Sequence, residues 1–453
     1  MRWVGLAIAI LSIPIFAALI GRDRSKRDLA IMAIGLMTFM TGQWTPSVAL
    51  YVWPLWFGTS KGIFISLIHS LAIALLATRP PGRYRIPFLP IMILYLATVC
   101  LSLAAAPNKV ASVFSIIQLV QAMVVFVAVA SELHRPSAIR ALLIGLSAGL
   151  VFQAAYVIRL KLAGVVQAAG TMDHQNILGL MVELSLLPLI ASVLEGERSK
   201  IIYAGILAGA ICIAGSGSRG AMGFFAFSLI LLILLSLLRR ASMRKWQITA
   251  LGVLASLAIV PFGFATLKER FGDSGFSTDE RSRMVLEDAA ASIAADYPLG
   301  AGANNFVVVA NAQGYIGKAG AGITQATRQQ PTHNAFLLAR AETGWSGQIV
   351  LMLLLASLIY TSLATAFRYR NLPLSGVALG CATGVFAAAL HSMFEYALHR
   401  SDVQTLFFIV AAMIVGISAI SRRQKSVRDQ SRAVTERSAR LNKGHAPVPE
   451  ISR

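Results

Sequence analysis

The sequence is poor in charge, and poorest in negative charge. Of its 453 residues only 13% are charged, with 20 acidic side chains against 40 basic ones, while 56% are apolar. A soluble protein of this length needs far more charge on its surface, so the composition excludes that class. Apolar runs of about 20 residues, the length that crosses a bilayer, recur along nearly the whole chain. The predicted fold class is therefore an all-α polytopic membrane protein.

Cysteine is also scarce, and the usual motifs of metal and nucleotide chemistry are missing. The three cysteines (Cys100, Cys212 and Cys381) lie inside apolar runs, which is typical of small core residues and not of disulfides or metal ligands. No group of histidines and cysteines has metal-ligand spacing. The turn at residues 215–220 lacks the lysine and the spacing of a phosphate-binding loop, and no nucleophilic serine elbow is present. We therefore predict neither a metal nor a cofactor.

The net charge of +20 invites a nucleic-acid partner, but its distribution argues against one. Of the 40 lysine and arginine residues, 26 lie in alternate predicted loops and in the tail after Ser421. This bias marks cytoplasmic loops. The sequence thus predicts a lipid bilayer as the partner and no nucleic acid, with the C-terminus in the cytoplasm and the N-terminus outside. The oligomeric state is left open.

About 12 to 13 transmembrane helices fit this alternation. The expected spans cover residues 4–20, 29–45, 61–78, 87–105, 110–130, 138–158, 175–194, 201–215, 220–238, 247–265, 345–366, 374–396 and 404–420. We divide the chain into N-terminal transmembrane helices (1–160), a membrane domain with its large loop (161–420, loop 266–344), and a basic tail (421–453). The tail has few apolar residues, so we expect it to be disordered. Segment 41–58 is rich in Trp and Pro and is expected to form a hairpin at the membrane interface, although a crossing here would change the N-terminal topology.

One outside loop, residues 266–334, is much longer than the others. Residues 280–296 have the apolar spacing of a helix, and a Pro/Gly break follows at residues 297–302. The next apolar stretch, from Asn334 to Ala366, is too long for one crossing, because 33 residues of helix measure roughly 50 Å. We therefore expect a short interfacial helix that ends at Thr343-Gly344 and a span that begins at Trp345.

The candidates for chemistry on the outside face are mainly cationic. Arg219 lies in a tight Gly/Ser turn whose backbone N–H groups can approach an anion, and its side chain offers a two-pronged donor to phosphate. Arg281 and Arg283 begin the loop helix. His333 precedes the interfacial helix, and histidine suits proton transfer near neutral pH. Each also has a plainer interpretation: an anchor at the interface, a solvated helix face, or a helix-terminal histidine.

Further polar residues lie at the outer ends of the predicted spans. His174 and Asn176 begin one span, and His174 is a rival to His333 as the reactive histidine. His391 and Glu395 are four residues apart, so we expect them to share a helix face. Glu183 lies deep in a span and is a candidate for a buried polar network. Asn334 and Glu342 flank the expected interfacial helix.

These motifs resemble those of the O-antigen ligase / O-antigen polymerase family of bacterial envelope glycosyltransferases. Ser218-Arg219-Gly220 is similar to the family's arginine turn, and Arg283 with Pro298–Gly302 is similar to a stretch of its large periplasmic loop. His333-Asn334 through Glu342-Thr343-Gly344 resembles its histidine signature, and residues 173–179 resemble an upstream segment. The resemblance covers about residues 169–396. In the family a tryptophan often follows the loop arginine, but here Glu287 or a neighbour stands there, so Arg281 stays in consideration.

The resemblance implies a GT-C-like glycosyltransferase of the bacterial inner membrane with its active site facing the periplasm. Its donor would be a glycan linked to undecaprenyl diphosphate, used without metal or nucleotide. Arg219, Arg283 and His333 become the expected catalytic residues. Arg281, His174, Asn176, Asn334, Glu342, His391 and Glu395 become the expected substrate-binding residues.

Two alternatives remain at this point. A ligase hands the glycan to lipid A-core, whereas a polymerase hands it to another lipid-linked repeat of O-antigen or exopolysaccharide. The segment from His333 to Gly344 favours the ligase. A transporter of polysaccharide or lipid is the alternative of another class, but transporters usually place ionisable residues near the midplane in repeated halves, and here Glu183 is the main deep charge.

Overall fold

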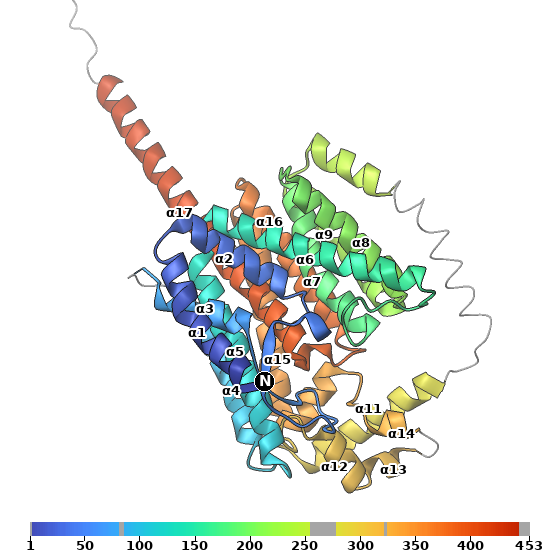
Figure 1. The fold of residues 1–453 in the computed structure, drawn as a ribbon. Helices are drawn as coiled ribbons and strands as arrows, with labels where there is room; N and C mark the ends of the chain where they lie inside the picture. The colour runs from blue at the N-terminus through green and yellow to red at the C-terminus, as the bar shows by residue number, and fades with distance from the viewer. Residues whose placement is uncertain (1, 81–85, 254–277, 321–323, 444–453) are drawn as a thin grey trace, which may run out of the picture.

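The computed structural model describes residues 2–80, 86–253, 278–320 and 324–443 as a helical bundle with a small helical domain at one end (Figure 1). Eight helices of the described chain are long and apolar enough to cross a membrane. They are α1 (Arg2–Ile20), α5 (Lys109–Glu132), α6 (Pro136–Leu162), α7 (Gln175–Leu194), α9 (Arg219–Arg239), α15 (Ala335–Arg368), α16 (Pro373–His391) and α17 (Ser401–Lys443). The chain is an integral membrane protein, and the all-α polytopic prediction is confirmed.

The remaining expected spans are shorter or built differently. The apolar helices α3 (Leu67–Ala77), α4 (Leu89–Ser102) and α8 (Lys200–Ser216) have 11 to 17 residues, and α2 (Arg24–Met37) has 14. The Trp-rich segment does form a hairpin, in which β1 (Ser47–Val52) pairs antiparallel with β2 (Gly62–Ser66) after a short turn, η1 (Gly42–Trp44). Residues 62–66, which hydropathy assigns to a span, are therefore the second strand. The expected span 247–265 lies mostly outside the described residues.

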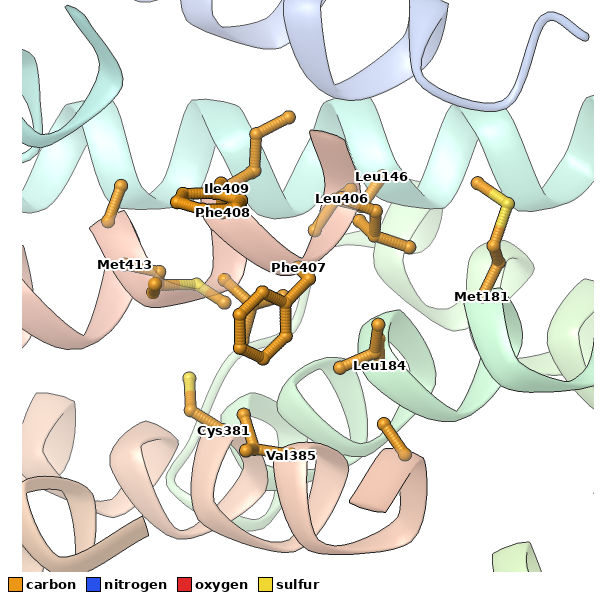
Figure 2. Close-up of a cluster of buried hydrophobic side chains, with 14 of the residues drawn as sticks. Leu146, Met181, Leu184, Cys381, Val385, Leu406, Phe407, Phe408, Ile409 and Met413 are labelled. Carbon is orange, nitrogen blue, oxygen red and sulfur yellow. The ribbon is translucent and has the colours of Figure 1, made fainter. Parts of the chain in front are cut away.

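The core of the bundle lies where α6, α7, α16 and α17 meet. Figure 2 shows Phe407 and Phe408 of α17 among Leu146 of α6, Leu184 of α7 and Cys381 of α16, all of them buried. Close packing of helix backbones accompanies this core. A Cβ atom on Gly380 of α16 would lie only 2.5 Å from the carbonyl oxygen of Leu187 in α7, and small residues at such crossings are the usual device of membrane helices.

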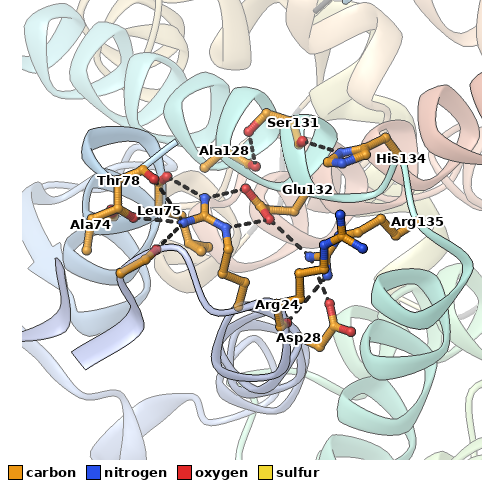
Figure 3. A network of polar contacts seen from close by, with 12 residues as sticks. Arg24, Asp28, Ala74, Leu75, Thr78, Ala128, Ser131, Glu132, His134 and Arg135 are labelled. Atoms are coloured by element: carbon orange, nitrogen blue, oxygen red, sulfur yellow. Dashed lines mark hydrogen bonds and ion pairs between the residues drawn. The ribbon is translucent and has the colours of Figure 1, made fainter. Parts of the chain in front are cut away.

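Charged side chains join the helices at the end far from the small domain. Helix α5 begins beside that domain, where the Asn108 N–H donates to Asn305 Oδ1 (3.0 Å), and Glu132 ends it about 36 Å away by helix length. Arg27 Nε donates to Glu132 Oε2 at 2.9 Å, and both side chains are almost fully buried. Figure 3 shows Glu132 shared with Arg135, which also pairs with Asp28 at 2.9 Å.

A second group of ion pairs joins other helices. Glu195, just after α7, binds Arg239 at the end of α9 (2.6 Å) and Lys245 (2.7 Å). Glu197 binds Arg140 of α6 at 3.0 Å. The basic residues that the charge rule assigns to the cytoplasm therefore also hold helix ends together.

The small domain, which we call the loop domain, consists of α11 (Thr278–Asp296), α12 (Phe306–Ala312), α13 (Tyr315–Ala319) and α14 (Gln325–Arg328), and it packs on the first part of α15. It has its own apolar core, which includes Leu286, Ile293, Phe306 and Leu338. The predicted loop helix over residues 280–296 is confirmed by α11. The part of the predicted loop before residue 278 lies outside the described residues.

Helix α15 breaks where the sequence predicts it. Gly344 has φ 73° and ψ −176°, so two helices meet there at a kink. Gly300 also has a positive φ, and each glycine faces backbone of the other segment: a Cβ on Gly344 would lie 2.4 Å from Pro298 O, and one on Gly300 2.3 Å from Glu342 O. The Pro298–Gly302 motif and the Thr343-Gly344 break thus pack backbone against backbone, at a distance that only glycine allows.

The basic tail is predicted from its sequence to be disordered, but residues 421–443 continue α17 as a helix that projects from the bundle (Figure 1). Its side chains are exposed at residues 422–431 and 435. Its composition of Arg, Lys, Gln, Glu and Ala favours helix, and the buried part of α17 supplies the nucleus from which that helix continues.

Candidate active site

The polar residues picked from the sequence gather at the loop-domain end of the bundle, where four segments meet. These are the start of α7, the start of α9, the segment before α15 and the turn after α16. Asn176 joins three of them: Ser218 Oγ donates to Asn176 Oδ1 at 2.8 Å, and Asn176 Nδ2 donates to Glu395 Oε2 at 2.9 Å. One amide side chain therefore connects the arginine turn before α9 to the turn after α16.

His333 completes this chain of contacts. Its Nδ1 lies 3.4 Å from Glu395 Oε1, and its Nε2 lies 3.1 Å from Gln330 Oε1. The ring also lies beside Tyr396, with ring centroids 5.6 Å apart. The side chain is 15% exposed, so it borders the interior while an edge remains reachable from outside.

Glu395 is the centre of the site. Burial by itself raises the pKa of its carboxyl, but the contacts with His333 and Asn176 and the charge of His174 outweigh burial and lower it to about 2. The backbone N–H of Tyr396 donates a further bond at 3.0 Å to Glu395 Oε1. The carboxylate is therefore ionised at any pH where the protein would work.

His174 lies in the same electrostatic environment. It precedes α7 as its N-cap, and its Nδ1 accepts the Asn176 N–H at 3.3 Å. Burial is the main cause that lowers its pKa; Glu395 opposes the change, and the charges of His333 and Arg283 add to it. His174, His333 and Arg283 are thus close enough for their charges to act on one another, although the chain separates them widely.

The two loop arginines differ in their surroundings. Arg281 is exposed on α11, whereas Arg283 is partly buried. The charge of Arg283 acts on His174 and also on Glu287, whose pKa is raised mainly by burial. Of the two loop arginines, Arg283 is thus the one whose charge acts on residues of the polar cluster.

Arg219 is the first residue of α9 and is exposed. The helix begins there because Ser218 Oγ accepts the N–H of Ala221 (3.2 Å), and Gly217 takes a left-handed conformation with φ 59°. The Ser218–Asn176 bond fixes this turn to α7. Arg219 therefore follows directly on a residue, Ser218, that is linked through Asn176 to the Glu395 carboxylate.

Asn334 and Glu342 make internal contacts. Asn334 Oδ1 accepts the N–H groups of Phe336 and Leu337 (3.0 and 3.1 Å) and so caps α15. Glu342 is buried, and its Oε1 accepts the N–H of Phe306 at 3.1 Å at the start of α12. Their expected substrate-binding role is untested, and the contacts described here hold the loop domain on the interfacial part of α15.

His391 and Glu395 do not share a helix face, because α16 ends at His391 and Glu395 lies in the following turn. His391 points inward instead. Its Nδ1 lies 3.1 Å from Glu183 Oε1, both side chains are nearly fully buried, and its ring lies 5.5 Å from that of Phe224. The expected deep polar network at Glu183 is therefore present as a buried Glu–His pair.

Several residues of the site escape sequence reasoning. Gln330 and Tyr396 contact His333, and nothing in their residue type or spacing signals this. Arg400, which pairs with Asp173 at 2.7 Å beside His174, does carry a signal: it is an outside arginine that breaks the charge bias, the same reason that singles out Arg219.

Within the described residues, no group of three His, Cys, Asp or Glu side chains has the geometry to hold a metal ion.

Comparison with protein families places part of the chain beside a known family. Residues 204–352 match the family model described as O-Antigen ligase. The matched stretch contains Arg219, Arg283 and His333 and ends inside α15, while Asn176 and Glu395 lie outside it. The match confirms the family resemblance, and this family describes membrane glycan-transfer enzymes of the ligase or polymerase type. No curated protein matches the chain.

Proposed function

Because residues 204–352 match the O-antigen ligase family model, we propose that this membrane protein transfers a glycan from undecaprenyl diphosphate to an acceptor hydroxyl at the loop-domain end of the bundle. One observation carries the proposal: the contacts from Ser218 through Asn176 and Glu395 to His333. These contacts connect two parts of the site. One is the turn that carries Arg219, and the other is His333, the histidine expected to meet the acceptor.

The donor side of the reaction needs positive charge. A lipid-linked diphosphate is already a good leaving group, so the protein has only to neutralise the charge that grows on it. Arg219 at the start of α9 and Arg283 on α11 supply guanidinium groups that bind phosphate oxygens in pairs. At the edge of the membrane, where water is partly excluded, such donors stabilise a developing charge strongly.

The acceptor side needs a group that takes a proton. The acceptor oxygen attacks the anomeric carbon, the bond from that carbon to the diphosphate oxygen breaks, and its electron pair leaves with the lipid diphosphate. His333 receives the acceptor proton on the ring nitrogen that faces away from Glu395. Arg219, Arg283 and His333 are thus the proposed catalytic residues, with His174 and Arg281 in the rim that meets substrate.

We place the protein in the bacterial inner membrane, with the loop domain in the periplasm and the tail of α17 in the cytoplasm. The charge bias supports this orientation, because the basic clusters around Arg27, Arg135 and Arg239 lie at the end of the bundle away from the loop domain. A periplasmic site meets lipid-linked glycans that have already crossed the membrane.

For the acceptor we propose lipid A-core, as in an O-antigen ligase, because the segment from His333 to Gly344 resembles ligases. Deletion of the gene, followed by gel analysis of lipopolysaccharide and exopolysaccharide, tests this choice. Loss of glycan on lipid A-core with normal polymer supports the ligase. Capping by single repeats indicates an O-antigen polymerase, and loss of secreted polymer with normal lipopolysaccharide indicates an exopolysaccharide polymerase.

Turnover by the reconstituted protein separates enzyme from transporter. The purified protein in sealed vesicles, given lipid-linked glycan and acceptor without ATP or an ion gradient, is expected to release undecaprenyl diphosphate and form the glycoside. Movement of lipid-linked glycan across the bilayer without glycoside formation would overturn the proposal.

A further inference from the structure

We infer that Glu395 is a positioning residue that fixes the orientation and tautomer of His333 and, through Asn176, ties His333 to the turn of Arg219. The inference rests on the proposed function, since it assigns how His333 is prepared for its role. It gives Glu395 and Asn176 a part in holding the site together instead of the substrate contact that the sequence suggests.

The first observation is the isolation of the Glu395 carboxylate. The side chain is only 3% exposed, and both of its oxygens have partners inside the protein: Oε1 faces His333 Nδ1 and accepts the Tyr396 N–H, and Oε2 accepts from Asn176. A buried carboxylate is stable when ionised only if its lone pairs are filled in this way. Little of it is left for a substrate to contact.

The second observation concerns the proton on the His333 ring. The buried Nδ1 of His333 lies 3.4 Å from Glu395 Oε1, within ion-pair reach but without the alignment of a hydrogen bond among the described residues. An ionised carboxylate only accepts hydrogen bonds, so a hydrogen on Nδ1 is the tautomer that suits this neighbour. The other nitrogen, Nε2, then carries a lone pair, and the atom of Gln330 that lies 3.1 Å from it is the amide oxygen Oε1. Two acceptors do not bond, so this tautomer requires the Gln330 amide to turn its NH₂ group toward Nε2. An amide can offer either its oxygen or its NH₂ group on that side. An acceptor hydroxyl that takes the place of Gln330 would find Nε2 ready to receive its proton.

The third observation is that the same carboxylate is linked to the donor side. Asn176 uses its NH₂ group for Glu395 and its oxygen for Ser218, and Ser218 caps the helix that begins with Arg219. An amide in this orientation cannot release one partner without leaving a polar group unpaired, which is unfavourable where water is largely excluded. The segments that carry His333 and Arg219 are therefore connected through Glu395, Asn176 and Ser218.

Removing the charge of Glu395 while keeping its shape tests the inference. In reconstituted vesicles, Glu395→Gln is expected to lower kcat on the order of 10- to 100-fold, by analogy with the partners that orient metal-bound histidines, with little change in KM for the lipid-linked donor. The matched control is Glu287→Gln. Glu287 lies on α11 where the charges of Arg283 and His333 act on it, so its change removes a nearby negative charge without removing the Glu395–His333 pair, and kcat is expected to stay within a factor of about 3.

A double-variant comparison distinguishes positioning from a general loss of structure. If Glu395 acts through His333, the variant with both His333→Gln and Glu395→Gln is no slower than His333→Gln alone. Losses that multiply would overturn the inference, as would a Glu395→Gln enzyme that turns over like the wild type while His333→Gln is inactive. Full activity of His333→Gln would instead contradict the proposed function.

Asn176→Ala supplies a second route if Glu395→Gln does not fold. This change removes the hydrogen bonds to both Glu395 and Ser218. It is expected to lower kcat for glycan transfer, while the thermal midpoint of the protein stays within a few degrees of the wild type. Added imidazole is expected to restore part of the activity of His333→Gly but none in the variant that also carries Asn176→Ala. Equal rescue in both backgrounds would show that the link to Asn176 does not matter.

Discussion

A single amide, Asn176, carries the connection between the two sides of the site. Its NH₂ group donates to Glu395, and its oxygen accepts from Ser218. One uncharged side chain thus connects polar residues of three separate segments. The charged residues around it differ in exposure. Arg219 is exposed and Arg283 partly buried, which suits groups that meet a substrate, whereas Glu395 is closed in.

The arginine turn gives the first prediction at this scale. Arg219→Lys keeps the charge but loses the planar pair of donors that matches a phosphate. Glycan transfer is expected to fall roughly 100- to 1,000-fold, the cost of removing one donor from a charge-stabilising site. Arg240→Lys, at an exposed arginine just after the other end of α9, is the matched control and is expected to cost much less. Vesicle assays with both variants decide, and equal losses would contradict the choice of Arg219.

The carboxylate of Glu395 gives a prediction about pH. Its pKa in the folded protein is about 2, below its ordinary value of 4.5. A lowered pKa contributes stability that is complete above about pH 4.5 and is lost as the pH falls toward 2. The contribution at neutral pH is on the order of 3 kcal/mol.

Thermal unfolding in detergent from pH 7 to pH 3 checks this. The difference in unfolding free energy between wild type and Glu395→Gln is expected to shrink as the pH falls below 4.5. Glu287 is expected to change the unfolding free energy with pH in the opposite direction. Burial raises the pKa of its carboxyl, so ionising it as the pH rises lowers the stability of the folded protein. A wild-type advantage over Glu395→Gln that stays constant down to pH 3 would refute the assignment.

At the scale of elements, the loop domain is fixed to the membrane part by backbone contact. The turn at Pro298–Gly302 and the kink at Gly344 approach so closely that the amides of Ala301 and Gly302 donate to the carbonyls of Ala341 and Glu342 at 2.9 and 3.0 Å. His333 lies one helix length before this junction. The junction therefore sets where the histidine stands relative to the bundle.

Gly344→Ala tests this junction. The conformation of Gly344 (φ 73°, ψ −176°) is open almost only to glycine, and a Cβ atom would collide with Pro298 O. We expect a loss of at least about 1–3 kcal/mol in unfolding free energy, together with reduced transfer. Gly223→Ala is the control, since a Cβ there meets nothing within 4 Å. An unchanged thermal midpoint for Gly344→Ala would disprove the close approach.

The ion pairs at the other end of the bundle lead to a prediction about helix packing. Arg27→Ala leaves the buried carboxylate of Glu132 with only Arg135 as a charged partner, and breaking such a pair costs about 3–5 kcal/mol. Replacing both residues by leucine is expected to recover most of that loss. Thermal unfolding of the single and double variants measures the coupling, and additive losses would mean that the pair does not act as a unit.

At the scale of the whole molecule, the distribution of charge and the position of the site agree. The polar cluster and the loop domain occupy one end of the bundle, and the exposed extension of α17 projects from the other (Figure 1). Between them α7 is buried on all sides, as is expected of the helix around which the others pack. This arrangement suits chemistry at one surface of a membrane.

Labelling from the two sides of the membrane tests the arrangement. Single cysteines at Ser292 of α11 and Ser426 of α17, both exposed positions, are introduced with the exposed Cys100 changed to serine. An impermeant maleimide is expected to reach Ser292→Cys from the periplasm, and Ser426→Cys only after the inner membrane is opened. Labelling of both from the same side would refute the proposed topology.

Composition and hydropathy alone determined the class of this protein, and local rules determined several of its features. Runs of apolar residues, the break at Thr343-Gly344 and the loop helix at residues 280–296 follow from length, glycine and apolar spacing, which are properties of short stretches of chain. The motifs also singled out most of the polar residues that meet at the site. These signals are local, so they identify residues but not their partners.

Tertiary structure decided which of those residues meet and how. It turned the Trp-rich region into a β-hairpin that takes up part of an expected span, ended α16 at His391 and directed that side chain to Glu183 instead of toward Glu395. It also brought Asn176, Ser218, His333 and Glu395 together from four separate segments. Contacts between residues more than 40 positions apart depend on how helices pack, and no spacing in the sequence records that packing.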